Sequence, residues 1–420
     1  MTSTHPVTNP RLVKEADALV DAGYRVRLVA TRNAAWAADV EHEFTARPWW
    51  DGIAWARIGP FARWPERQAM RLRRRLLRAS VGRRPGLVPA LDALALHDAP
   101  AQLARLAAEQ PADLYIAHNL AALPAAARAA RRHRAKLGFD AEDFHRGELT
   151  PTARNRVVID LTRALEEAYI PACDYLTAAS EGIAEAYAEA LSIPRPTTVL
   201  NTFPLSERDA PIPAEDLEHE RRGDALSLYW FSQTIGPDRG LGDALVVMAR
   251  LGPGVRLHLR GTWVSGYEAQ FMAAARALGV AERVHHLPVV PPFELIARTA
   301  RHDVGLALET GETPNRKIAT TNKILAYLVA GLAVAATDTR GQRAVMDAAP
   351  GAGLTYRPGD VDTLAAWLTD LRRSPDRLAR ARQAARAAAE ARFCWERQKT
   401  GFTDLIARVL EAPARSRQAW

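Results

Sequence analysis

Segments with the apolar spacing of helices alternate along the chain with short apolar runs typical of buried strands. The first helix is predicted to begin after Asn9, a good N-cap, with Pro10 at its first position, and to end before Gly23. A short apolar strand at 24–30 follows that glycine at once. Helix and strand joined through one glycine are typical of α/β units. The apolar residues of the helix repeat every three or four positions: Leu12, Val13, Ala16, Leu19 and Val20.

The same alternation covers most of the chain and predicts an α/β fold with doubly wound parallel sheets. Predicted strands lie at 24–30, 113–117, 136–139, 225–231, 255–260, 284–287, 304–308 and 333–337. Predicted helices lie at 10–22, 123–134, 241–250, 267–278, 292–299 and 322–330, with further helices up to residue 410.

Residues 202–224 interrupt this alternation, because three prolines alternate there with charged residues and no apolar periodicity remains. We interpret them as an interdomain linker. A chain of 420 residues also exceeds the size at which one core keeps growing. We therefore expect Rossmann-like domains at 1–203 and 204–390, and a final helical segment, 391–420, that packs back toward the first domain.

The opening of the first domain departs from the usual order, in which a strand comes first. Only residues 1–8 precede the first helix. Either Thr2 to His5 form a truncated strand or the chain begins late.

Composition favours an ordinary globular protein, with 48% hydrophobic and 25% charged residues. The longest apolar run, from Ile324 to Ala336, is interrupted by Tyr327 and Gly331 and is shorter than the ~20 residues that span a bilayer. Met1 to Pro10 lack the pattern of a secretory signal. We expect a cytoplasmic protein without a transmembrane helix.

The two cysteines, Cys173 and Cys394, lie in unrelated contexts without metal-ligand spacing. This predicts no disulfide framework and no zinc site. No metal or other cofactor is expected.

A net charge of +8, mostly from arginine, favours partners that carry phosphate. Residues 63–84 contain nine arginines and one glutamate, interleaved with Met70, Leu72, Leu76 and Leu77. This basic amphipathic helix is either a solvated helix lying over the sheet or a site of adhesion to an anionic membrane or a charged acceptor. Nucleic acid is not expected, since no aromatic residues are interleaved with the arginines at 67–84.

Two strand ends in the second half carry candidate phosphate-binding residues. In parallel α/β sheets, ligands bind at the carboxyl ends of strands, where helix N-termini offer N–H groups to phosphate. After strand 225–231, a turn-rich loop leads through Arg239 into a helix. After strand 304–308, residues 309–321 lead into a helix whose first turn holds Lys323.

Other catalytic motifs are missing. The sequence contains no Gly-x-Ser-x-Gly, no His-Glu-x-x-His, no P-loop and no Gly-x-Gly-x-x-Gly fingerprint. Nicotinamide chemistry is therefore not expected.

The segment Asn322-Lys323-Ile-Leu-Ala326-Tyr-Leu-Val-Ala-Gly331-Leu-Ala-Val334 resembles the signature of family 4 glycosyltransferases, which have the GT-B fold. Arg239-Gly240-Leu241 is similar to the basic phosphate loop of that family. The strand at 113–118, which ends in His118, and the segment at 166–184 are similar to first-domain segments. The resemblance covers about residues 9–400.

The resemblance implies transfer of a sugar from a nucleotide-diphosphate sugar to an acceptor hydroxyl, with retention and without an obligatory metal. The second domain would hold the donor and the first the acceptor, a glycan or lipid-linked glycan of the cell envelope or for export. The implied catalytic residues are His118, Arg239 and Lys323. The implied donor-binding residues are Thr234, Gly240, Glu309, Thr321 and Asn322.

Three positions depart from the family pattern. Ala326 stands where the family has a glutamate that binds the ribose, and Ile318 stands where its partner acid is expected. Thr234 replaces an arginine. Glu309 or Glu312 is a candidate substitute acid.

Residues 140–148 follow a first-domain strand and are rich in polar side chains. Asp140, Glu142 and His145 are candidate acceptor-binding residues. Alternatively, 140–148 form a surface loop whose acids neutralise nearby arginines.

Two other functions remain compatible with the sequence. One is a nucleotide-sugar-binding or scaffold protein without catalytic activity, suggested by the three departures. The other is a GT-B enzyme with a different reaction, such as a nucleotide-sugar epimerase.

Overall fold

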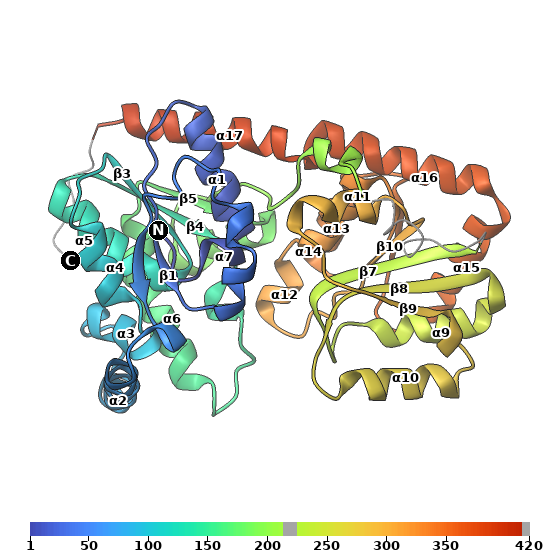
Figure 1. Cartoon of the computed structure of the whole chain (residues 1–420), viewed down its shortest axis with the longest axis horizontal. Coiled ribbons are helices and arrows are strands. Elements are labelled where there is room, and N and C mark those ends of the chain that lie inside the picture. The colour runs from blue at the N-terminus through green and yellow to red at the C-terminus, as the bar shows by residue number, and fades with distance from the viewer. Residues whose placement is uncertain (213–224, 414–420) are drawn as a thin grey trace. The chain divides into compact units, whose positions relative to one another are not determined.

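The computed structural model describes residues 1–212 and 225–413 and consists of two compact α/β units (Figure 1). Both units are built on parallel sheets, which confirms the predicted fold class. Unit 1 comprises Met1–Val199, Thr313–Asn315 and the described residues from Lys399 onward; unit 2 comprises the described residues of Leu200–Glu312 and Arg316–Gln398.

The first four residues complete the sheet of unit 1. Thr2 N donates to Val29 O of β1 at 3.0 Å, and His118 N of β3 donates to Met1 O at 2.8 Å. The strand order around this segment is β2-β1 on one side and β3-β4-β5-β6 on the other. The strands are β1 (Val29–Arg32), β2 (Ala54–Arg57), β3 (Leu114–His118), β4 (Lys136–Ala141), β5 (Tyr175–Ala178) and β6 (Thr197–Thr198).

Helices cover the sheet of unit 1. The first begins as predicted, because Asn9 Oδ1 accepts from Leu12 N at 3.0 Å and Pro10 occupies the first helical position. The strand after it begins at Val29, later than the predicted position 24. The helices are α1 (Pro10–Asp21), α2 (Trp64–Val81), α3 (Pro89–Leu96), α4 (Pro100–Ala107), α5 (Leu123–His133), α6 (Arg156–Tyr169), α7 (Glu181–Leu191) and the part of α17 (Trp395–Glu411) from Lys399 onward.

Unit 2 contains a six-stranded parallel sheet with the order β12-β11-β10-β7-β8-β9. This is a doubly wound order, and the chain reverses its direction of winding between β7 and β10. Ligands of such sheets bind at this switch point. The strands are β7 (Leu226–Ile235), β8 (Val255–Trp263), β9 (Val284–Leu287), β10 (Val304–Ala307), β11 (Ala333–Thr337) and β12 (Gly353–Tyr356).

Two strands of unit 2 extend beyond their predicted ends. The pairing of β7 with β8 shifts register after Phe231 and resumes with Thr234 opposite Thr262. Gly261, with φ +148°, allows Ser232 O to approach so closely that a Cβ would lie 2.3 Å from it. The predicted loop therefore begins later, and Thr234 belongs to the strand.

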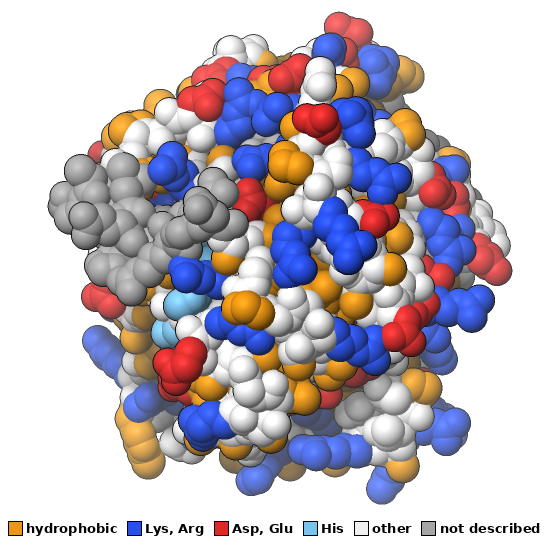
Figure 2. Space-filling view, turned by 90° about the vertical axis from the view of Figure 1, so that its right-hand side faces the viewer, with side chains coloured by type: hydrophobic (Ala, Val, Ile, Leu, Met, Phe, Trp, Pro, Cys, Tyr) orange, Lys and Arg blue, Asp and Glu red, His pale blue; other side chains and the backbone are white. Residues whose placement is uncertain are grey.

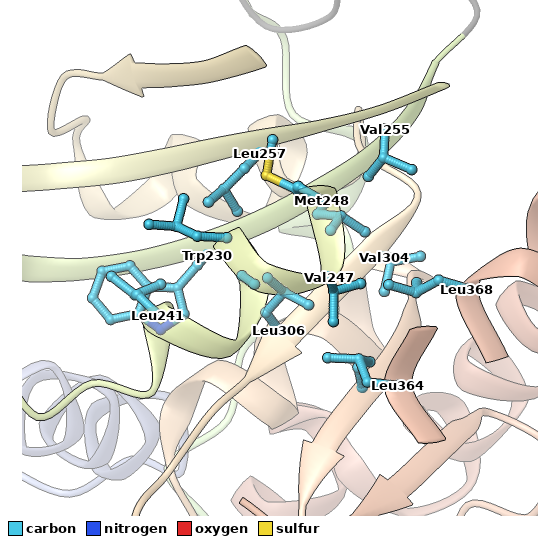
Figure 3. Close-up of a cluster of buried hydrophobic side chains, with 14 of the residues drawn as sticks. Trp230, Leu241, Val247, Met248, Val255, Leu257, Val304, Leu306, Leu364 and Leu368 are labelled. Atoms are coloured by element: carbon cyan, nitrogen blue, oxygen red, sulfur yellow. The ribbon is translucent and has the colours of Figure 1, made fainter. Parts of the chain in front are cut away.

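Alternate residues of these strands pack on helices on the two faces of the sheet. On one face, Trp230, Leu257 and Leu306 pack with residues of α9 and α15 (Figure 3). On the other, Tyr327 of α13 covers Gly305, where a Cβ would lie 2.2 Å from the ring. The helices are α9 (Leu241–Leu251), α10 (Tyr267–Ala277), α11 (Leu295–Thr299), the part of α12 (Pro314–Ile318) from Arg316 onward, α13 (Asn322–Ala330), α14 (Arg340–Asp347), α15 (Val361–Arg373) and α16 (Pro375–Ala388).

The predicted linker at 202–224 is described only in part. Leu205–Asp209 form a short 3-10 helix, and residues 213–224 lie outside the described residues, as do 414–420 of the predicted C-terminal segment.

The surface in Figure 2 mixes the two signs of charge. Lysine and arginine side chains are interspersed there with acids and scattered apolar groups. The excess positive charge is therefore not gathered into one basic patch on this face.

Among the described residues, no helix combines the length and the apolar character needed to cross a bilayer.

Candidate functional site

In unit 2, the loop after β7 brings the start of α9 against the end of β10. Gly240 caps α9 in the left-handed region, with φ +70°. A Cβ on Gly240 would lie 2.7 Å from Leu308 O, so only glycine fits this approach. Arg239, the residue before it, is half-buried at the same strand end. The N–H groups of the first turn of α9 thus lie at the switch point of the sheet.

Lys323 and Glu309 form an ion pair at this strand end. Lys323 Nζ lies 2.9 Å from Glu309 Oε1, and the side chains are 13% and 10% exposed. The ammonium also lies 5.6 Å from the centre of the Trp230 ring, so β7 and the loop after β10 hold it in place at the start of α13.

Glu309 is charged despite its burial. Burial alone would raise the pKa of its carboxyl, but Lys323, Arg239 and Arg316 outweigh burial and lower that pKa below its ordinary value. Gly240, next to Arg239, packs against Leu308, next to Glu309, so Arg239 and Glu309 lie at the same strand end. Three residues predicted from two separate strand ends therefore form one charged group.

The start of α13 offers further polar groups. Thr321 is the N-cap, but its hydroxyl makes no capping hydrogen bond. The hydroxyl oxygens of Thr310 and Thr321 are buried and have no hydrogen-bond partner among the described residues. Asn322, the first residue of the helix, is exposed. The site thus combines a cation with unsatisfied donors at a helix N-terminus, an arrangement suited to phosphate.

Buried hydrogen bonds hold the loop after β10 in place. Thr337 Oγ1 donates to Glu309 O at 2.6 Å, and Gln342 Nε2 donates to Ala307 O at 3.0 Å. Gln342 is fully buried. The position of Glu309 is therefore set by β11 and α14 beneath it.

In unit 1, the sheet edge at the ends of β3 and β4 carries a buried group of charges. Arg11 of α1 donates two hydrogen bonds to the Asp140 carboxylate, at 2.5 and 2.6 Å. His118 Nδ1 lies 3.3 Å from Asp140 Oδ2, and His118 Nε2 lies 3.5 Å from Glu15 Oε2. His118 is 4% exposed, and the other three are at most 1% exposed.

These contacts shift the pKa values of the group in opposite directions. Burial would lower the pKa of His118, but the surrounding carboxylates, Glu15 foremost, raise it to about 9. Burial and the charge of Asp140 raise the pKa of Glu15. Burial would raise the pKa of Asp140 too, but Arg11 and His118 hold it well below its usual range. At neutral pH, His118 is an imidazolium between carboxylates.

The three predicted acceptor-binding residues differ in their burial and in the hydrogen bonds that they make within unit 1. Asp140 is fully buried, with Thr177 Oγ1 as a further donor at 2.6 Å. Glu142 accepts from Asn9 Nδ2 at 2.5 Å and is 23% exposed. His145 Nδ1 lies 2.6 Å from Glu148 Oε1. Their binding of an acceptor stays a prediction.

The sequence reading did not single out Arg11 and Glu15. The available signal was a pair of opposite charges four residues apart, beside the apolar face of α1. Such pairs are common on exposed helix faces, so the spacing alone does not identify a buried pair.

No protein-family model matches the sequence, and no curated protein matches it significantly. Solved structures do match. HepE (Alr3699) of Anabaena in complex with UDP aligns with 97% of this chain and 98% of its own, at 17% identity and a TM-score of 0.68. The same protein has been solved with UDP-glucose, at 16% identity and a TM-score of 0.67.

Two further structures align over nearly the whole chain. Sucrose-phosphate synthase of Thermosynechococcus elongatus covers 97% of this chain and 94% of its own, at 14% identity and a TM-score of 0.68. A glycosyltransferase from Rickettsia africae ESF-5 covers 98% of each, at 11% identity and a TM-score of 0.66.

Proposed function

Because the chain has the GT-B fold, as the sequence predicts, we propose that it is a glycosyltransferase. It transfers a sugar from a nucleoside diphosphate sugar to an acceptor hydroxyl, with retention of configuration and without a metal. The observation that carries the proposal is that Lys323 pairs with Glu309 at the switch point of the unit 2 sheet, where the packing of Gly240 on Leu308 brings Arg239 to the same strand end.

The donor diphosphate would lie between the first turns of α9 and α13. Arg239 and the N–H groups after Gly240 meet it from one side, and Lys323 and the hydroxyl of Thr321 from the other. When the phosphate takes up the charge of Lys323, Glu309 becomes available to hydroxyl groups of the donor. Glu309 then supplies the carboxylate that Ala326 does not.

The proposed reaction requires mainly positive charge from the protein. As the bond between sugar and phosphate breaks, negative charge grows on the departing diphosphate, and the two cations stabilise it. The departing phosphate takes the proton from the acceptor hydroxyl, so no separate general base is required. His118, held as an imidazolium, is proposed as a further catalytic residue.

The acceptor is proposed to be a glycan or lipid-linked glycan of the cell envelope, glycosylated on the cytoplasmic side. An acceptor presented at a membrane is supported by the basic segment 63–84. Glu142 and His145 are proposed to meet its hydroxyl groups.

Donor turnover tests the proposal. The wild type is incubated with UDP-, GDP- and ADP-sugars, and proton NMR follows the release and the anomeric configuration of the sugar. We expect slow hydrolysis of one donor with retention, and its loss in Arg239→Ala. The matched control is Arg250→Ala, which removes an arginine from the other end of α9, where it pairs with Asp362. Release from none of the donors, or equal rates in both variants, would contradict the proposal.

A second candidate is a nucleotide-sugar-binding protein without turnover. It is favoured by Ala326, which is fully buried and places no carboxylate at the family position. Nucleotide binding without hydrolysis or transfer would support it over the enzyme.

A further inference from the structure

Helix α2 of unit 1 turns large apolar side chains outward. Trp64, Leu72 and Leu76 are 65%, 59% and 61% exposed, and Met70 is buried. Leu72 and Leu76 are one turn apart, and Trp64 precedes Leu72 by about two turns, so the three share one side of the helix. A surface helix normally turns its apolar side toward the core. α2 does not follow this rule.

Four arginines of α2 form two groups. The first group fixes the helix to the body of unit 1: Arg74 Nη1 lies 3.0 Å from Asp98 Oδ2, and Arg78 Nε donates to Ala95 O at 2.8 Å. The second group, Arg71 and Arg75, is exposed, and neither residue has an ion pair or hydrogen bond with any described residue. The outer face of α2 therefore combines exposed leucines with unpaired guanidinium groups.

The outer face is also hollowed. An open depression of about 790 Å³ runs along α2 and is lined by Arg71, Leu72 and Arg75 together with Arg74 and Arg78 of the first group. In Figure 1, α2 is seen almost along its axis at the periphery of unit 1, with α3 on one side. The helix is thus supported from within the unit, while its apolar and basic side chains face outward.

We propose that α2 is an interfacial helix through which the protein binds an anionic lipid bilayer. Leu72, Leu76 and Trp64 enter the boundary between headgroups and acyl chains, and Arg71 and Arg75 bind lipid phosphates. An anionic bilayer accounts for both features of the face, because its phosphates pair with the arginines and its acyl region buries the leucines. A solvated helix would satisfy only the arginines.

This membrane contact deepens the proposed location of the acceptor but does not depend on the donor chemistry. If the protein hydrolyses the donor but does not bind vesicles, the proposed membrane contact is wrong and the proposed transferase stands. If the protein binds vesicles but hydrolyses no donor, the proposed transferase is wrong and the membrane contact stands.

Sedimentation of the full chain with vesicles provides the test. Vesicles of phosphatidylcholine alone and of phosphatidylcholine with phosphatidylglycerol are compared at low and high salt. We expect binding to the anionic vesicles only, weakened by salt, and a loss of affinity of at least about tenfold in Leu72→Glu/Leu76→Glu. The control, Leu278→Glu, changes a leucine of unit 2 that is 39% exposed and should bind as the wild type does.

A second measurement separates insertion from simple charge attraction. The tryptophan emission of the wild type should shift to shorter wavelength on anionic vesicles, and Trp64→Phe should reduce that shift. No binding to anionic vesicles would overturn the proposal, and so would equal binding by the double glutamate variant. Sedimentation velocity adds a third outcome: a dimer that the double variant abolishes, without vesicle binding, would identify the face as a contact between two copies instead.

Discussion

His118 should keep its proton well above the pH at which an ordinary histidine loses it. Burial alone would lower its pKa, but its neighbours from α1 and β4 are carboxylates, and they raise it from 6.5 to about 9. A shift of this size corresponds to about 3 kcal/mol of stability. Because the pKa is raised in the folded state, that stability is complete below about pH 6.5 and is lost as the pH rises through about 9.

The perturbation that isolates this effect is His118→Gln, which keeps a polar side chain but cannot titrate. Urea unfolding of wild type and variant is compared at about pH 6 and about pH 10. The advantage of the wild type should shrink by about 3 kcal/mol between the two. NMR of protein labelled at histidine Cε1 should show a resonance with a midpoint near 9 that the variant lacks, beside that of His145, whose pKa is also raised to about 9. An advantage that does not change with pH, or an His118 midpoint near 6.5, would refute the reasoning.

Two further predictions concern unit 2. Gly240→Ala should cost about 1–3 kcal/mol of folding stability and weaken nucleotide binding, because its Cβ would lie 2.7 Å from Leu308 O and the residue is left-handed. The control Gly242→Ala, with nothing within 4 Å of its Cβ, should be neutral or slightly stabilising. Thermal unfolding measures the stability and calorimetry the binding of both variants, and equal effects would count against the packing argument. Lys323→Met should cost about 3 kcal/mol of folding stability, because it leaves Glu309 buried and charged without its partner. Adding Glu309→Gln to the same chain should restore most of that stability. If denaturant titrations show that the two losses add instead, the two residues do not form a buried pair.

Periodicity and turn residues predicted the elements of unit 2 closely. β9, β11 and α13 have their predicted bounds; Pro288 directly follows β9, and Gly331 ends α13 before β11. The end of β7 was predicted too early, since its pairing with β8 resumes after a register shift that no local pattern reveals. Strands as short as β6, with two residues, carry no periodicity to detect.

The sequence predicts only those residues of the candidate site whose role follows from their position next to a strand or a helix. Arg239 and Lys323 precede or begin helices after strands, and this spacing identifies them as candidate phosphate ligands. Their convergence on Glu309 depends on the strand order, which the local sequence pattern does not specify. Arg11 and Glu15 were missed for the same reason, since their partners on β3 and β4 are more than 100 residues away in the chain.

The direction in which α2 faces was also beyond the sequence. The alternation of leucine and arginine predicts an amphipathic helix for either orientation. The exposed fractions of Leu72 and Leu76, together with the contacts of Arg74 and Arg78 with unit 1, show that the leucines point outward.

The central claim is that Arg239 and Lys323 hold a nucleoside diphosphate at the switch point of unit 2. The most direct measurement is a calorimetric titration of wild type, Arg239→Ala and Arg250→Ala with UDP, GDP and ADP, followed by the monophosphate of the nucleotide that binds. The account predicts that one diphosphate binds the wild type and Arg250→Ala alike, more tightly than its monophosphate, and that Arg239→Ala loses about tenfold or more in affinity for it. Absence of binding, or an affinity that Arg239→Ala leaves unchanged, would contradict it.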